Sequence, residues 1–120
     1  MTTNLVHRKA LFTGTTDGSN CDSLPAKAAG VLGGLDIVVN NAGVIRRGAI
    51  TEATDEDYAV SFAVNVDALF RICRAAIPLL TEQGGGVIIN VASCWGLRPG
   101  PNHPIYCMSK AAIASMTQCL

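Results

Sequence analysis

Three short apolar runs predict three strands. Residues 35–40 and 87–92 are almost wholly apolar, and a shorter apolar stretch covers residues 9–13. Continuous apolar runs of this length are typical of strands that are buried on both faces of a parallel sheet. We therefore expect an α/β fold with a parallel sheet, in which residues 35–40 are buried on both faces and residues 87–92 form a buried strand.

Residues 54–80 predict one long amphipathic helix. Thr54 is a favourable N-cap, and three acidic residues follow it in the first turn, where they suit the helix dipole. The apolar residues that recur at helical spacing are Phe62, Val66, Leu69, Phe70 and Cys73. Asn65 interrupts this apolar stripe, and a buried asparagine needs hydrogen-bond partners. A shorter helix is expected between Asp22 and Gly34.

Three polar residues around the last strand suggest chemistry. Ser93 ends the third apolar run, and Tyr106 and Lys110 are four residues apart. If a helix starts near Pro104, this spacing places both on one face. A tyrosine has a pKa of about 10 and is a poor base at pH 7, but a nearby ammonium favours the phenolate. Taken alone, the pair is more typical of a helix surface than of a catalytic site.

Two glycine-containing turns follow the first and second strands. The first is Thr-Gly-Thr-Thr-Asp-Gly at residues 13–18, and the second is Asn-Asn-Ala-Gly at residues 40–43. Glycine after a strand lets the backbone turn tightly and approach a pyrophosphate. Either motif by itself is also compatible with an ordinary turn.

Together, and in this order, these motifs resemble the classical short-chain dehydrogenase/reductase family. The resemblance implies a Rossmann-like, doubly wound parallel sheet in a three-layer α/β/α arrangement. It also implies hydride transfer between NAD(P) and a secondary alcohol or ketone. The resemblance further implies homodimers or homotetramers through the helices that correspond to residues 55–80 and 104–120. A cytoplasmic location is expected from the cysteines, which form no C-x-x-C pair.

The resemblance assigns roles to individual residues. Tyr106 would be the acid/base, Lys110 would lower its pKa and contact the ribose, and Ser93 would position the substrate oxygen. Asn65 would complete a proton relay. The implied cofactor-binding residues are Gly14, Thr16, Asp17 and Gly18 near the pyrophosphate, Asn40, Ala42 and Gly43 on the adenosine side, and Tyr106 and Lys110.

Individual charged residues bear on the choice of cofactor and substrate. Asp17 precedes the second glycine of the turn, and its charge would repel the 2′-phosphate of NADP, so NAD is favoured over NADP. Arg46 and Arg47 either belong to a solvated loop or favour an anionic substrate such as a sugar acid, with a polyol as the neutral option. The alternatives are an enzyme that resembles 3-oxoacyl-(acyl-carrier-protein) reductases and a non-catalytic family member.

The stretch after Gly18 departs from the family pattern. Only 17 residues, 19–35, separate Gly18 from Asp36, whereas one βαβ unit takes about 30. The third glycine of the turn is also missing. We therefore interpret residues 1–120 as a single dinucleotide-binding domain that lacks a segment after about Gly18 and a C-terminal part beyond Leu120.

Composition narrows the range of partners. The chain has 49% hydrophobic residues, 15% charged residues and a formal net charge of zero. This balance argues against nucleic acid or an anionic membrane as the main partner. The five cysteines form no C-x-x-C pair, so we expect reduced core or near-core thiols. His7 and His103 lack ligand spacing, and no metal site is expected.

Overall fold

The protein is seen in a computed structural model that describes residues 7–14 and 20–120. Its sheet consists of three parallel strands, β1 (Ala10–Thr13), β2 (Ile37–Asn40) and β3 (Val87–Asn90), in the order β1-β2-β3. The register aligns Phe12 with Val39 and Val39 with Ile89. The expectation of an α/β fold with a parallel sheet is confirmed.

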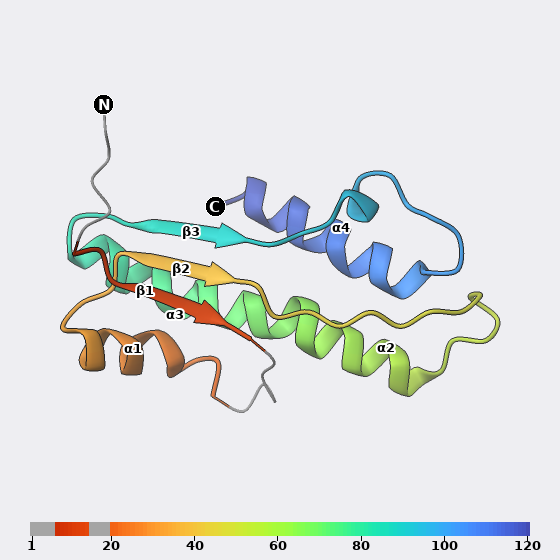
Figure 1. Cartoon of the computed structure of the whole chain (residues 1–120), viewed down its shortest axis with the longest axis horizontal. Helices are drawn as coiled ribbons and strands as arrows, with labels where there is room; N and C mark the ends of the chain where they lie inside the picture. The colour runs from red at the N-terminus through yellow and green to blue at the C-terminus, as the bar shows by residue number, and fades with distance from the viewer. Residues whose placement is uncertain (1–6, 15–19) are drawn as a thin grey trace.

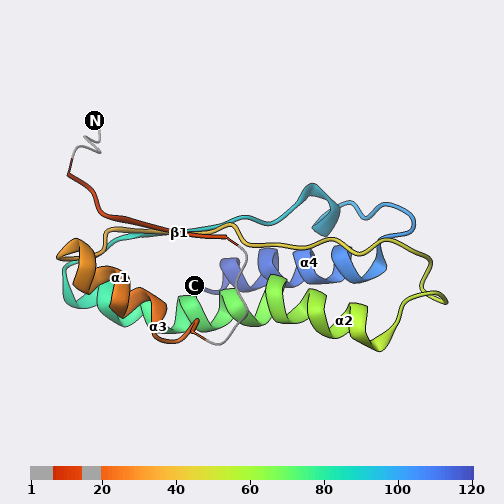
Figure 2. The same cartoon turned by 60° about the horizontal axis from the view of Figure 1, so that its bottom comes forward.

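The helices follow the sequence expectations closely. They are α1 (Leu24–Leu32), α2 (Asp55–Phe62), α3 (Ala68–Glu82) and α4 (Pro104–Gln118). A π-helical turn, η1 (Ala63–Asp67), joins α2 to α3, and a short 3-10 helix, η2 (Cys94–Gly96), follows β3. Figures 1 and 2 show that α1 to α4 lie on one face of the sheet. The described residues therefore form two of the three expected layers.

The core lies between the sheet and this helical layer. Val38 of β2 is fully buried against α3, and Leu11 and Ile88 pack beside it from the neighbouring strands. Leu69 and Cys73 of α3 are buried, as the helical spacing predicts. Phe70 was expected on the same stripe, but it is 48% exposed. Its position, about 100° round the helix from Leu69, turns it away from the core.

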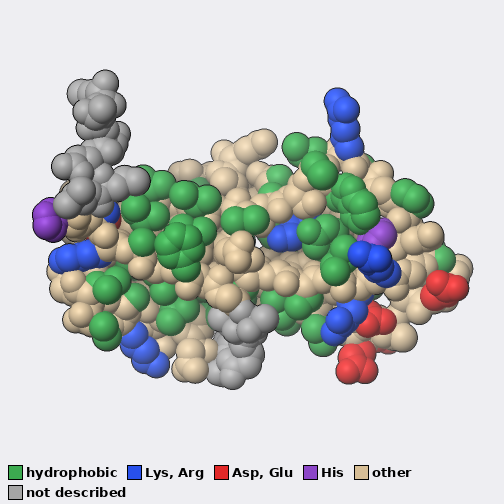
Figure 3. Space-filling model, in the orientation of Figure 1, with side chains coloured by type: hydrophobic (Ala, Val, Ile, Leu, Met, Phe, Trp, Pro, Cys, Tyr) green, Lys and Arg blue, Asp and Glu red, His purple; other side chains and the backbone are tan. Residues whose placement is uncertain are grey.

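The opposite face of the sheet is apolar and exposed. Side chains alternate between the two faces of a strand, so the residues next to the core residues point away from the helices. Phe12 is 70% exposed, Val87 52% and Ile89 48%, and Figure 3 shows hydrophobic side chains gathered over the strands. The expectation that residues 87–92 form a buried strand is therefore wrong. Only the central strand β2 is well buried on both sides.

The ends of the helices explain where they begin and stop. The Thr54 hydroxyl accepts a hydrogen bond from the Asp57 backbone N–H at 3.0 Å, which confirms the predicted N-cap. Gly33 ends α1 with φ near 70°, a left-handed conformation that favours glycine. Helix α4 begins at Pro104, as expected, and its first residue needs no N–H bond there.

The cysteines are all free thiols, but they are not all in the core. Cys21, Cys73 and Cys107 are buried, whereas Cys94 and Cys119 are exposed, which corrects the expectation for the last two. In the part of the chain that the structure describes, no group of three or more His, Cys, Asp or Glu residues could hold a metal ion. None of the helices described for residues 7–14 and 20–120 is long and apolar enough to cross a membrane.

Candidate active site

The turn after β3 packs directly on the backbone of α4. Ser93 caps η2, and its Oγ accepts a hydrogen bond from the Trp95 backbone N–H at 3.2 Å. A Cβ added at Gly96 would lie 2.6 Å from the Lys110 carbonyl carbon and 2.8 Å from the Ala111 nitrogen. Only a residue without a side chain permits this approach. Gly96 therefore fixes the turn that carries Ser93 against α4.

Tyr106 and Lys110 lie one turn apart on α4, as their spacing predicts. The Lys110 Nζ is 5.8 Å from the centre of the Tyr106 ring and donates a hydrogen bond to the Val91 carbonyl at 2.9 Å. Lys110 is only 4% exposed. Burial penalises the ammonium and lowers the pKa of Lys110 from its usual 10.5. The segment after β3 and helix α4 therefore hold the buried Lys110 ammonium near the Tyr106 ring.

The turn after β2 approaches the same ammonium. A Cβ added at Gly43 would lie 3.3 Å from the Lys110 Nζ and 3.5 Å from the Asn65 Oδ1. Gly43 itself is exposed. The absence of a side chain at this position keeps a narrow space between the lysine and the asparagine amide.

Asn65 is the polar residue of the π-helical turn and is fully buried. Its Oδ1 accepts from the Val44 N–H at 2.8 Å, and its Nδ2 donates to the Val44 carbonyl at 2.9 Å. The same Nδ2 donates to the Ser109 hydroxyl at 2.9 Å. π-helical turns are frequent at functional sites, and buried amides need hydrogen-bond partners. Asn65 and its partners Val44 and Ser109 therefore form an ordered part of the candidate site. The role of Asn65 in a proton relay stays a prediction.

Asn40 has a different environment from the other predicted cofactor residues. Its side chain is buried on the helical face of the sheet, where Nδ2 donates to Asn90 Oδ1 at 2.9 Å and to Cys73 Sγ at 3.4 Å. The Asn40 amide therefore joins β2 to β3 and to α3. Any contact of this residue with a cofactor would have to use its backbone.

Thr13 holds the turn that follows β2. Its buried Oγ1 accepts hydrogen bonds from the backbone N–H groups of Asn41 at 3.1 Å and Ala42 at 3.4 Å. Gly14 comes next and is exposed, with open space where a Cβ would lie. The remaining predicted cofactor residues, Thr16, Asp17 and Gly18, lie outside the described residues.

Trp95 and His103 form an aromatic cluster beside Tyr106. The Trp95 ring is 4.3 Å from the His103 ring and meets Tyr106 edge-on at 6.2 Å, measured between ring centres. The His103 Nδ1 lies 2.7 Å from the Pro101 carbonyl, which can only accept, so Nδ1 carries a proton. Trp95 itself is half-buried, so its ring is partly accessible beside Tyr106.

Within residues 7–14 and 20–120, an ion-pair partner exists for Arg46 but not for Arg47. The Arg46 Nε lies 3.3 Å from Asp57, and the Arg46 side chain is 47% exposed. Arg47 is exposed, and the part of the chain that the structure describes offers it no such partner. A hydrogen bond of 2.9 Å from the Gly48 N–H to the Asn102 carbonyl joins this loop to the loop before α4.

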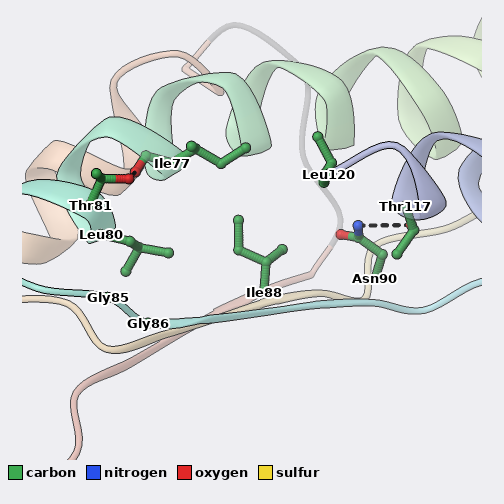
Figure 4. A pocket seen from close by; sticks show the side chains of 9 residues that line it. All are labelled: Ile77, Leu80, Thr81, Gly85, Gly86, Ile88, Asn90, Thr117 and Leu120. Atoms are coloured by element: carbon green, nitrogen blue, oxygen red, sulfur yellow. Dashed lines mark hydrogen bonds between the residues drawn. The ribbon is translucent and has the colours of Figure 1, made fainter.

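A separate pocket of about 420 Å³ lies between the last turns of α3 and α4, beside β3 (Figure 4). Ile77, Leu80 and Ile88 contribute much of its apolar lining, and Asn90 donates to Thr117 Oγ1 at 3.0 Å on its wall. Neither the serine after β3 nor the Tyr–Lys pair lines it. The pocket is therefore distinct from the candidate active site.

Sequence reasoning missed two residues that organise the site, Gly96 and Ser109. A signal existed for Ser109, because a serine inside an amphipathic helix often bonds the carbonyl three or four residues earlier. Its partner Asn65 is 44 residues away, and no spacing rule connects them. Gly96 gave no local signal, since its neighbour on α4 is known only from the fold.

A parallel sheet with helices packed against it is the arrangement of Rossmann-type folds. The sequence matches the family model of short chain dehydrogenases over residues 4–120. The chain belongs to this family.

Individual relatives agree with that assignment. The chain is 40% identical over 101 residues to an uncharacterized oxidoreductase of Thermotoga maritima, covering 84% of this chain and 40% of the relative. It is 39% identical over 114 residues to an L-2,3-butanediol dehydrogenase of Corynebacterium glutamicum, covering 92% and 44%. The structure of an NAD⁺-bound xylitol dehydrogenase superposes with a TM-score of 0.80 at 26% identity, covering 86% of this chain and 40% of that one. The chain thus spans less than half the length of these relatives.

Proposed function

We propose that this chain carries the catalytic segment of an NAD(P)-dependent dehydrogenase that acts on a secondary alcohol or, in reverse, on a ketone. The observation that supports this most directly is the buried Lys110 ammonium beside Tyr106. Burying an ammonium is costly because the charge loses its hydration, so a Tyr–Lys pair without a function is expected to stay exposed. The cost is understandable where the charge acts on a neighbouring phenol.

The residues around Lys110 fit the nicotinamide end of a dinucleotide. Lys110 has three N–H donors, and among the described residues only Val91 accepts one of them. Two donors therefore remain for ribose hydroxyls, and Gly43, which lies beside the Lys110 Nζ, is exposed. When bound, the nicotinamide ring would supply the acceptor or donor of the hydride. NAD stays favoured over NADP on the charge of Asp17.

Tyr106 and Ser93 would share the substrate oxygen. Because the Ser93 Oγ already accepts from the Trp95 N–H, its own O–H is available to donate to a carbonyl or alcohol oxygen. Tyr106 would take the proton of the alcohol during oxidation and return it during reduction. The Lys110 Nζ, 5.8 Å from the centre of the Tyr106 ring, is the cation nearest to this step among the described residues. The narrow space between Lys110 and Asn65 is the proposed start of the proton path to solvent.

For the substrate, we favour an uncharged diol or polyol over a sugar acid. Arg46 is already paired with Asp57, which leaves Arg47 as the only loop arginine without an ion pair among the described residues. The relatives named above act on butanediol and xylitol by their descriptions, and this supports the same class. A reductase of acyl-carrier thioesters stays the alternative. Assembly as a homodimer or homotetramer and a cytoplasmic location stay predictions.

The test compares the two tyrosines of the chain. Tyr106→Phe keeps the ring and removes the hydroxyl, so turnover of a diol and polyol panel should be abolished while NAD binding persists. Tyr58→Phe is the matched control, because Tyr58 lies on α2, is 48% exposed and stacks on Phe62 at 4.5 Å. Turnover by Tyr106→Phe within about tenfold of wild type would refute the assignment. Absence of dinucleotide binding by the wild type in a calorimetric titration would instead support the alternative of a non-catalytic family member.

A further inference from the structure

Ser109 lies at the centre of a hydrogen-bond chain that joins three elements. It is fully buried on α4, between Tyr106 and Lys110 on one side and the π-helical turn on the other. Its hydroxyl donates to the Tyr106 carbonyl at 2.8 Å and accepts from Asn65 Nδ2 at 2.9 Å. Asn65 in turn holds both backbone groups of Val44.

The direction of each bond in this chain is fixed by the chemistry of its atoms. A backbone carbonyl can only accept, so the single Ser109 proton points to Tyr106. The Ser109 oxygen then presents a lone pair to Asn65, which must use an amide proton there. The second proton of that amide goes to the Val44 carbonyl, and the Asn65 oxygen accepts from the Val44 N–H. The Asn65 amide orientation is therefore determined.

We propose that Ser109 is a positioning residue that sets the distance between the catalytic turn of α4 and the turn after β2. This inference rests on the proposed function, since it concerns the geometry of that same site. Through Ser109 the Tyr106 backbone is tied to Asn65, and through Asn65 to the loop that follows Gly43. The Tyr106 phenol and the loop after Gly43, which would face the cofactor, are thereby held at a fixed distance from each other.

Loss of the hydroxyl has a specific consequence. Ser109→Ala leaves one buried Asn65 N–H without an acceptor, and a buried unpaired donor drives local rearrangement. Asn65 can recover a partner only by moving, and Val44 moves with it because it is bonded at both of its backbone groups. The substrate-contacting atoms remain present, but their relative positions change. The rate of the chemical step should suffer more than the affinity for substrate.

Ser61 provides a matched control on the same side of the molecule. It is also fully buried, but among the described residues its hydroxyl has no hydrogen-bond partner. Ser61→Ala therefore removes the same atom from an equally buried site without breaking a chain. Ser115, which is exposed on α4, controls for an alanine in that helix. Ser109→Thr retains the hydroxyl and serves as the rescue variant.

The experiment measures kcat and KM with NAD and the substrate that the panel identifies. Ser109→Ala should lower kcat by about tenfold to a hundredfold, the range that a displacement near 1 Å produces, with KM changed less than about twofold. Ser61→Ala and Ser115→Ala should leave both constants unchanged, and Ser109→Thr should recover most of kcat. A Ser109→Ala kcat equal to wild type, or an equal loss in Ser61→Ala, would overturn the proposal.

A second readout does not depend on turnover. Hydrogen exchange of the Val44 N–H and the Asn65 side-chain amide, followed by NMR, should become at least about tenfold faster in Ser109→Ala and stay unchanged in Ser61→Ala. If the wild type is inactive, the proposed function fails, and this measurement still decides the role of Ser109. Unchanged exchange would refute it. Should Ser109→Ala not fold, Ser109→Cys fills the site with a weaker acceptor and is measured instead.

Discussion

Gly96→Ala offers a direct test of how the serine turn is held against α4. The added Cβ would lie 2.6 to 2.8 Å from three atoms, the carbonyl carbon and oxygen of Lys110 and the nitrogen of Ala111. All three belong to the helix backbone, so no side-chain rotation can relieve the overlap. Because ordinary contacts begin near 3.4 Å, the turn must move away from α4 by about 0.8 Å.

This displacement has two measurable effects. Overpacking of a tight contact costs about 1–3 kcal/mol, so the free energy of unfolding in urea should fall by that amount. Ser93 moves with the turn while Tyr106 stays on the helix, and a misplacement near 1 Å can cost about a hundredfold in rate. The expected result is a loss of both stability and kcat.

Two other glycines separate these effects. A Cβ at Gly86 would meet Leu80 Cδ2 at 2.6 Å and the Asp36 carbonyl at 2.8 Å, so Gly86→Ala should destabilise the fold while leaving kcat per folded molecule intact. Gly30 lies in α1 with nothing within 4 Å of an added Cβ, and Gly30→Ala should stabilise by about 0.5–1 kcal/mol. Wild-type stability and kcat in Gly96→Ala would refute the reasoning.

Three further predictions concern stability. Burial lowers the pKa of Lys110 below 10.5, so between these two pKa values the folded state binds fewer protons than the unfolded state. The free energy of unfolding in urea should therefore rise with pH in this window for the wild type. Lys110→Met should lack the rise. The Lys9 backbone N–H, helped by a neighbouring arginine, lowers the pKa of Asp36, so stability should fall as pH drops below 3.8 through that pKa, and thermal melts of Asp36→Asn should lack this loss. Thr54→Ala should cost about 1 kcal/mol in urea unfolding because the Asp57 N–H loses its cap, and an unchanged midpoint would contradict this.

Much of this fold could be predicted from residues that lie close together in the sequence. The cap at Thr54, the start of α4 at Pro104 and the placement of Tyr106 and Lys110 on one helix each depend on residues within one turn of each other. The three strands were visible because each is a short apolar run. These features need only backbone geometry and side-chain preferences, and both are properties of the sequence.

Burial on the sheet was decided by tertiary structure. The run at 87–92 has the composition of a strand covered on both faces, yet Val87 and Ile89 are about half exposed. Whether a strand lies at the edge of a sheet, and whether helices cover one face or two, depends on which elements pack around it. An apolar run indicates a preference for burial, but it does not specify which element of the fold will cover it.

The same distinction applies to the candidate site. The sequence by itself determined the chemical groups, a phenol, an ammonium, a hydroxyl and an amide, and the order in which they occur. Only the tertiary structure decided that Ser109 joins Asn65 to Tyr106, that Gly96 lies on the backbone of α4, and that Arg46 is paired with Asp57. Contacts such as the one between Asn65 and Ser109 join residues tens of positions apart, and their geometry exists only once the sheet and its helices have packed.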